Sequence, residues 1–347
     1  GTPPLRVFVR PAKLGASDTA HLIELHRAAL AWLERYFDVP YPFAKLDCVL
    51  VPSFPYGGME HAGAIFYREQ AIVFDHAPTD GEIVRRSTLV YHELSHQWFG
   101  NLVTMRWFDD LWLKEGFATF VAYRAMDALE PERRSWLRFL QRVKPRAYEV
   151  DATPGTTPVY QELANLADAK SAYGAIVYNK APAVLRELDE RLGSERFRRG
   201  LTRFLRDHSF ANATWQDLAK ALEDEAELDL RRWSDRWLLA PSLPSVRVEC
   251  ERAADGSITR AVLRQRPVGG DGTWPLRVEL CCALADGSWL RTVVDCDGAE
   301  APIPEVKGRK DVRAIVANPG DVAYAQFLPD ESSRDWIAAH VHEGADP

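Results

Sequence analysis

Up to about residue 240, hydrophobic residues recur mainly every three to four positions, which is the spacing of one face of an α-helix. The first such segment follows Ser17 and Asp18, either of which can cap a helix N-terminus. Its apolar face consists of Leu22, Leu25, Ala29, Leu30, Leu33 and Phe37. Four short runs have strand-like patterns, at residues 5–10, 46–51, 64–67 and 71–74. We therefore expect three or four strands before residue 80.

From Asp80 the pattern is helical as far as residue 240. The predicted helices cover residues 80–99 and 109–129, a segment that begins at Pro131, and residues 171–192, 194–207, 214–226 and 229–239. After residues 241–244, which contain two prolines, short strand-like runs follow at 245–250, 258–265, 276–283, 289–294 and 312–316. Residues 336–341 resume a helical pattern. The pattern predicts an α+β fold in which a small all-β sandwich follows a mainly helical part.

The chain has 347 residues, of which 46% are hydrophobic and 27% charged, and its formal net charge is −7. These values predict about two globular domains. The sequence has no long basic run and no stretch of about 18 apolar residues, so it predicts neither nucleic-acid binding nor a membrane span. Five cysteines without regular spacing favour reduced thiols and a cytoplasmic location.

The strongest candidate for chemistry is H-E-L-S-H, in which His92 and His96 are four residues apart. Residues i and i+4 lie on the same side of a helix, so both imidazoles can bind one metal ion at about 2.0–2.1 Å, the zinc–nitrogen distance. Glu93 flanks the two ligands and can accept a proton from an attacking water. Glu115, on the next predicted helix, can supply a third ligand and leave a fourth position open, as catalytic zinc requires.

The H-E-x-x-H motif has two competing interpretations. Two helix-face histidines with a solvated glutamate between them would give the same residues without a metal. The metzincin pattern H-E-x-x-H-x-x-G-x-x-H is excluded, because Phe99 and Leu102 stand where it needs glycine and a third histidine. The sequence therefore favours a zinc hydrolase whose third ligand is a carboxylate.

Four segments, in order, resemble the aminopeptidase N family of gluzincin metallopeptidases, which includes the leukotriene hydrolases. They are P-S-F-P-Y-G-G-M-E-H around Glu60, H-E-L-S-H-Q-W-F-G-N-L-V-T, W-F-D-D-L-W-L-K-E-G-F-A-T-F, and Y-N-K-A-P-A-V-L from Tyr178. The resemblance covers roughly residues 1–240. It implies a thermolysin-like catalytic domain, one Zn²⁺ ion as cofactor, and a peptide with a free N-terminus as substrate.

The resemblance also implies roles for residues outside the zinc motif. Glu60 would pair with the α-amine of the substrate, and Tyr178 would donate a hydrogen bond to the tetrahedral oxyanion. Gly57 and Gly58 would offer backbone groups to the main chain of the substrate. Tyr56 would line the pocket for the first side chain.

Three further residues have competing interpretations. Tyr173 is close to Tyr178 in the sequence and is the alternative source of the phenol. Asp109 or Asp110 either orients a ligating imidazole through a hydrogen bond or caps the helix that carries Glu115.

The resemblance predicts how the chain is divided. It predicts a remnant strand of a preceding β-domain at 1–11, a zinc peptidase domain at 12–243, a β-sandwich at 244–330 and a helical tail at 331–347, with flanking domains of a longer chain missing. The chain departs from the family pattern at three places. His61 and Lys114 stand where asparagine is usual or common, and the pair Ala181-Pro182 stands where glycine is frequent.

The predicted function is that of a zinc-dependent aminopeptidase, which releases N-terminal amino acids from peptides. Two alternatives stay open at this stage. One is a zinc endopeptidase or epoxide hydrolase on the same scaffold. The other is a metal-binding interaction fragment with little or no turnover.

Overall fold

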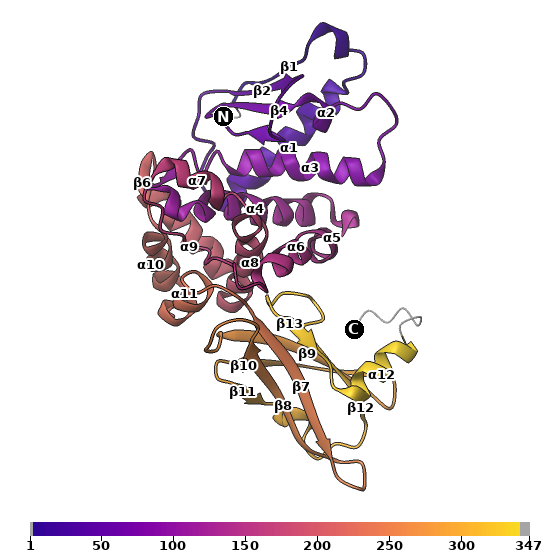
Figure 1. Ribbon diagram of the computed structural model, residues 1–347. Helices are drawn as coiled ribbons and strands as arrows, with labels where there is room; N and C mark the ends of the chain where they lie inside the picture. The colour runs from indigo at the N-terminus through magenta and orange to yellow at the C-terminus, as the bar shows by residue number, and fades with distance from the viewer. Residues whose placement is uncertain (1–2, 341–347) are drawn as a thin grey trace. The chain divides into compact units, whose positions relative to one another are not determined.

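The computed structural model describes residues 3–340 (Figure 1). It contains both helices and strands, which agrees with the predicted α+β class. The chain divides into two compact units. The first contains the described residues up to Pro145, Tyr160–Leu185 and Leu192–Leu228. The second contains Arg146–Val159, Arg186–Arg191 and the described residues from Asp229 onward.

A four-stranded sheet forms part of the first unit, and its strand order is β1-β2-β4-β3. The strands are β1 (Leu5–Phe8), β2 (Leu46–Val51), β3 (Gly58–Met59) and β4 (Ala64–Arg68). β1, β2 and β4 are parallel, whereas the short edge strand β3 pairs antiparallel with β4. The sequence pattern does not reveal β3, which has only two residues. Glu60 follows β3 directly, so the sheet edge positions this candidate residue.

The helix α1 (Thr19–Phe37) begins where the sequence predicts it. The side chain of Asp18 accepts a hydrogen bond from the backbone N–H of His21, which confirms Asp18 as the N-cap. The predicted apolar face is buried, and its residues are Leu22, Leu25, Ala29, Leu30, Leu33 and Phe37.

The helices α3 (Asp80–Ser95) and α4 (Trp112–Leu129) pack against each other (Figure 1). A capping box between Thr79 and Glu82 fixes the start of α3. α3 ends four residues before the predicted boundary, because the chain turns at Gly100, whose φ of 127° suits glycine. α4 starts at Trp112 after a 3₁₀ turn (Phe108–Asp110), not at residue 109 as predicted.

Two segments differ from the prediction. Residues 71–74, predicted as a strand, form none: residues 71 and 72 end the short helix α2 (Glu69–Ile72), and Val73 is its extended C-cap. The buried Glu69 carboxylate accepts two hydrogen bonds of 2.8 Å from Arg10. The backbone N–H of Val73 donates to the carbonyl of Glu69, which completes one helical turn. Residues 101–106, predicted as a connector, include β5 (Val103–Met105), which pairs with β6 (Ala211–Ala213).

The remaining helical elements follow the predicted order. They are α5 (Ser135–Arg142), α6 (Lys144–Asp151), α7 (Leu166–Ala172), a π-helix (Ile176–Lys180), α8 (Ala181–Leu192), α9 (Ser194–Asp207), α10 (Trp215–Ala226) and α11 (Arg231–Trp237). Short 3₁₀ turns also occur at Pro11–Lys13, Pro131–Arg133 and Pro304–Val306. The single helix predicted at 171–192 is thus divided, with a π-helix in the middle.

The strands of the second unit form two sheets. Their bounds are β7 (Pro244–Arg252), β8 (Ile258–Pro267), β9 (Leu276–Leu284), β10 (Trp289–Cys296), β11 (Glu300–Pro302), β12 (Val312–Ala317) and β13 (Gln326–Leu328). One sheet has the order β10-β9-β12 and the other β11-β8-β7-β13. The helix α12 (Glu331–His340) follows, and Val341, the last residue of the predicted helical pattern, lies outside the described residues.

Two general expectations can be compared with this fold. All five cysteines are free thiols, as the irregular cysteine spacing predicts. Among residues 3–340, no helix combines the length and apolar character that crossing a membrane requires.

His26 lies on the buried face of α1 and has two hydrogen-bond partners. Its Nδ1 is 2.7 Å from the carbonyl oxygen of Leu22, and its Nε2 is 3.1 Å from the hydroxyl of Tyr67 on β4. Nδ1 can therefore donate to the carbonyl while Nε2 accepts from the phenol, which needs a neutral ring. Burial lowers the pKa of His26 from 6.5 to about 4.

This neutral imidazole makes stability depend on pH. Because the pKa of His26 is lower in the folded state, the unfolded chain binds the proton first as the pH falls from 6.5 to 4. We expect this group to reduce the free energy of unfolding by about 2 kcal/mol between pH 7.5 and pH 5. Urea unfolding at both pH values should show this loss in the wild type but not in His26→Gln. The control is His21→Gln, the same change at a partly buried position of the same helix. An equal pH dependence of stability in the wild type and in His26→Gln would contradict the role given to His26.

Candidate active site

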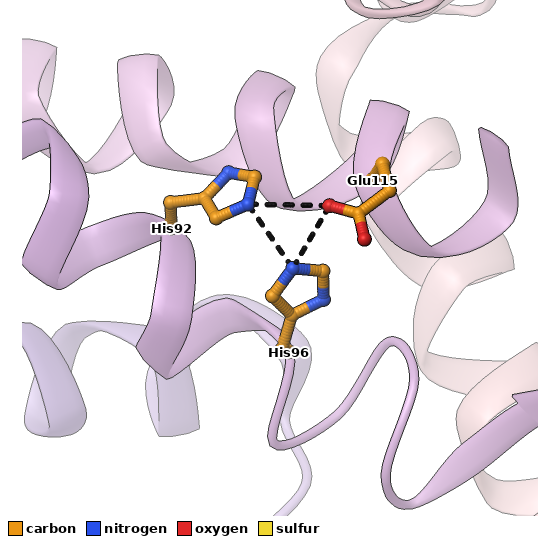
Figure 2. Close-up of side chains that lie close together, drawn as sticks. All are labelled: His92, His96 and Glu115. Carbon is orange, nitrogen blue, oxygen red and sulfur yellow. Dashed lines mark hydrogen bonds and ion pairs between the residues drawn. The ribbon is translucent and has the colours of Figure 1, made fainter. Parts of the chain in front are cut away.

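His92, His96 and Glu115 form a triangle of donor atoms (Figure 2). The Nε2 atoms of the two histidines are 3.1 Å apart. Oε2 of Glu115 lies 3.4 Å from Nε2 of His92 and 3.3 Å from Nε2 of His96. In a tetrahedral site, two ligand atoms are separated by about 1.6 times the metal–ligand distance, which is ~3.3 Å for bonds of about 2.05 Å. The three side chains therefore fit a tetrahedral metal ion with bonds of this length.

Two helices deliver these donors. His92 lies in the last turn of α3 and His96 at its C-cap, so the four-residue spacing directs both rings to one side. Glu115 lies in the first turn of α4, where its backbone N–H bonds to Leu111 C=O at 3.0 Å. The packing of α3 against α4 brings the carboxylate to the two rings.

Hydrogen bonds on the far side of each ring orient the imidazoles. Nδ1 of His96 lies 2.9 Å from Phe99 C=O, and Nδ1 of His92 lies 3.4 Å from the hydroxyl of Thr119. A ring nitrogen that donates to a carbonyl leaves the other nitrogen with a free lone pair. In His96 that free nitrogen is Nε2, which faces the triangle.

Both interpretations of Asp109 and Asp110 are wrong. Asp109 accepts a hydrogen bond from Leu163 N–H at 2.5 Å, and Asp110 accepts one from Trp215 N–H at 3.2 Å. The N-cap of α4 is Leu111, which makes no side-chain hydrogen bond. The two aspartates belong to the 3₁₀ turn before α4 and bind other segments. The imidazole partners, a backbone carbonyl and Thr119, carry no recognisable signal in the sequence.

Glu93 points into the site from α3. Its side chain is buried, and Oε2 has no hydrogen-bond partner among the described residues. Burial raises the pKa of Glu93 to about 8. A buried carboxyl oxygen without a partner is costly in a structural role, and such groups are common where a residue exchanges protons with a substrate or water.

Two amide side chains after α3 hold the backbone of Glu60. Gln97 and Asn101 both donate to the carbonyl of Glu60, at 3.0 Å and 2.5 Å. Gln97 also accepts a hydrogen bond of 3.0 Å from Gly63 N–H. The loop after β3 is thereby fixed to the segment that carries His96. Sequence reasoning missed both residues, although they lie within the quoted H-E-L-S-H-Q-W-F-G-N segment.

The Glu60 side chain is buried beside the triangle and forms an ion pair with Lys114. One ligand atom from each of Glu60, Glu93 and His96 lies within 4.8 Å of the others. Burial opposes ionisation of Glu60, but His96 and Lys114 outweigh it and lower its pKa. Burial also opposes protonation of His96, yet Glu60 and Glu115 raise its pKa to about 9. The site without an ion therefore attracts positive charge.

Tyr178 lies in the π-helix Ile176–Lys180, an element that often occurs at functional sites. Its ring faces that of His92 at an interplanar angle of 29°, with 6.4 Å between the ring centroids. Burial, followed by the negative charge of Glu115, raises the pKa of Tyr178 well above its usual value, so the phenol keeps its proton. Tyr173, the alternative tyrosine, is 42% exposed, and its ring centroid is 6.4 Å from that of Tyr178.

Tyr56 and Gly57 precede the edge strand β3. The side chain of Tyr56 is 63% exposed and contacts Phe54 edge-on at 5.9 Å, so it is not a core aromatic. The carbonyl of Gly57 accepts a hydrogen bond of 2.8 Å from Arg68 N–H. One lone pair of this carbonyl is thus already used inside the sheet.

A His–His–carboxylate triangle, with a buried glutamate beside it that has one carboxyl oxygen without a hydrogen-bond partner, is the arrangement of a metal-dependent hydrolase. A model of the peptidase family M1 domain matches residues 22–237, and the chain belongs to this family. The resemblance to the aminopeptidase N family is thereby confirmed.

Several characterised proteins are similar to the chain. It is 35% identical to aminopeptidase N of Streptomyces lividans, over 97% of this chain and 41% of that protein. It is 34% identical to aminopeptidase M1 of Arabidopsis thaliana, over 80% of this chain and 31% of that protein. It is 35% identical to leucyl aminopeptidase of Saccharolobus solfataricus, over 65% of this chain and 29% of that protein. The chain thus spans less than half the length of these relatives.

Gly58 leaves room for the carboxyl group of Glu93. A Cβ atom at Gly58 would lie 2.6 Å from Glu93 Cγ and 2.5 Å from Cδ, closer than real side chains approach. Gly58→Ala must therefore displace the Glu93 side chain. A shift of about 1 Å in a reacting group can cost roughly 100-fold in rate.

We accordingly expect Gly58→Ala to lower the kcat for peptide-bond hydrolysis by roughly 100-fold without loss of a metal ion bound by the triangle. Gly15→Ala is the control, because no atom lies within 4 Å of a Cβ at that position. Metal analysis and steady-state kinetics would check both results. Equal kcat values for the two variants would show that Gly58 does not determine the position of Glu93.

Proposed function

We propose that this chain is the catalytic part of a zinc-dependent aminopeptidase, which removes single amino acids from the N-terminus of a peptide. The names of the three relatives described above include the word aminopeptidase. The observation that carries the proposal is the position of the Glu60 carboxylate beside the metal-binding triangle.

The distance between Glu60 and the triangle supports removal of one residue at a time. Ligand atoms of Glu60 and His96 lie within 4.8 Å of each other. In a peptide, the α-nitrogen and carbonyl carbon of one residue are separated by two bonds of about 1.46 and 1.52 Å. An α-amine held by Glu60 therefore brings the first peptide carbonyl to the triangle, while the next carbonyl lies about one residue further away.

Glu93 acts as the general base and then as the general acid. It accepts a proton from the attacking water and returns it to the leaving amine as the C–N bond breaks, so that one water is added across the peptide bond. In the site without an ion, burial raises the pKa of Glu93, which favours the proton-bound form that the second transfer requires. The phenol of Tyr178 donates a hydrogen bond to the oxyanion.

His92, His96 and Glu115 would hold the zinc ion. When bound, zinc would polarise the scissile carbonyl and lower the pKa of a water molecule. Tyr56, Gly57 and Gly58 would line the substrate side of the site, as the family resemblance implies.

The proposal extends to the organisation of the chain. We assign a thermolysin-like arrangement to residues 12–243, a β-sandwich to 244–330, and the segments 1–11 and 331–347 to the junctions with flanking domains. The strand β1 within 1–11 also pairs with β2, so this segment contributes to the sheet of the first unit. The length of the relatives supports such domains. The five free thiols favour a cytoplasmic location.

The function is tested with paired substrates. The zinc-loaded 347-residue chain should hydrolyse L-alanine 4-nitroanilide and leave its N-acetyl derivative almost uncleaved, because acetylation removes the charge that Glu60 binds. Glu60→Gln should lower kcat/KM for the free amine by roughly 100-fold, the factor that corresponds to about 3 kcal/mol for a buried charge pair.

Blocked peptides distinguish the alternatives. Cleavage of N-acetylated peptides as fast as free ones would indicate an endopeptidase and would contradict the amine-anchor role of Glu60. A zinc-loaded chain that cleaves neither substrate would contradict the proposed activity of this chain.

A separate substitution tests the proton transfers. Glu93→Gln keeps the size of the side chain but removes its basicity, and we expect a decrease in kcat of roughly 10²–10⁴-fold with zinc still bound. Glu24→Gln, the same change at an exposed position of α1, is the control. Unchanged turnover in Glu93→Gln would exclude this residue as the base.

A further inference from the structure

Lys114 already places an ammonium group on the carboxylate that the proposed function assigns to the substrate. Its Nζ lies 2.5 Å from Glu60 Oε1 and 3.4 Å from Glu115 Oε1. The side chain of Lys114 is only 15% exposed, and those of Glu60 and Glu115 are 8% and 6% exposed. A lysine ammonium and the α-ammonium of a peptide are the same chemical group, with the same charge and the same donors.

We propose that Lys114 is a specificity-determining residue, whose ammonium competes with the α-ammonium of the substrate for Glu60 and must be displaced before a peptide binds. The inference rests on the proposed function of Glu60 as the amine anchor. Before any substrate binds, the ammonium of Lys114 already neutralises the charge of the Glu60 carboxylate.

The electrostatics support competition and not joint binding. The largest effects of neighbouring charges on Glu60 come from His96, Lys114 and Glu115, and among these three only Lys114 carries an ammonium group. Two ammonium groups on the same carboxylate would lie a few ångströms apart and repel each other. Solvent and salt screen this repulsion poorly, because the side chains of Glu60 and Lys114 are largely buried.

The stem of Lys114 is held against an apolar surface. Gly100 lacks a Cβ, and one at this position would lie 3.2 Å from Lys114 Cγ. Lys114 also lines a small cavity whose other walls include Phe99, Val103 and Phe204. These walls offer no charged or hydroxyl group to an ammonium. A displaced ammonium therefore moves away from this cavity toward solvent, while the stem stays packed.

Competition has a specific consequence for binding. A ligand with a free amine must separate the ion pair, so its affinity is lower than the Glu60 carboxylate alone would give. A ligand whose amine is acetylated does not compete and is unaffected. Removal of the Lys114 charge should thus favour only ligands with a free amine.

The test measures binding and needs no turnover. The probes are L-alanine amide and N-acetyl-L-alanine amide, titrated into the zinc-loaded 347-residue chain and followed by NMR. Every protein compared, including the one with the wild-type lysine at position 114, carries Glu93→Gln, so that the amide is not hydrolysed during the titration. Lys114→Met keeps the length of the side chain and removes its charge, Lys114→Gln removes the charge with a polar group retained, and Lys114→Arg keeps the charge. We expect L-alanine amide to bind both neutral variants about tenfold more tightly than the wild type, a factor that corresponds to about 1.4 kcal/mol.

The controls separate this inference from the proposed function. Lys114→Arg should bind L-alanine amide like the wild type, and Glu60→Gln/Lys114→Met should lose the tenfold gain. The N-acetyl amide should not distinguish any of the proteins. Unchanged or weaker binding of L-alanine amide by both neutral variants, with zinc content intact, would overturn the inference even if the wild type is an active aminopeptidase. Tighter binding together with absent hydrolysis would support the role of Lys114 and contradict only the proposed activity.

Discussion

The packing of α3 against α4 is the constraint on which the site depends. The spacing of His92 and His96 on α3 provides only two donors. Glu115 completes the triangle because it lies in the first turn of α4, where the helix dipole also favours a carboxylate. Nitrogen–oxygen distances of 3.3–3.4 Å across the two helices mean that a small shift between them would remove the third donor.

Burial of charge is the second determinant of the site. Glu60, Glu93 and Glu115 are all buried, and carboxylates without partners are costly in such surroundings. Lys114 compensates part of this charge through its contact with Glu60, and the raised pKa of His96 compensates another part. Glu93 responds differently, since burial keeps it protonated to a higher pH. A divalent cation in the triangle would complete the balance, which agrees with the donor set.

Features set by one helix or strand could be predicted from the sequence, whereas those set by contacts between distant segments could not. The predicted ranges 46–51 and 194–207 coincide with β2 and α9, and the His92–His96 spacing follows from helical geometry alone. The hydrogen bond between Thr119 and His92 and the one from Gln97 to the Glu60 backbone depend on how separate elements pack. The sequence predicts a strand at residues 71–74, whereas a short helix covers 69–72. The Arg10 side chain that bonds to Glu69 lies about sixty positions earlier, so this contact has no local signal in the sequence.

The most direct test of the account is the coordination of the bound metal. X-ray absorption spectroscopy on the chain loaded with one equivalent of zinc should show two imidazole nitrogens and a carboxylate oxygen at about 2.0–2.2 Å, with no sulfur ligand. The same measurement on Glu115→Ala should show loss of zinc or of its carboxylate ligand. An unchanged spectrum and zinc content in Glu115→Ala would contradict the claim that the two helices bind one ion between them.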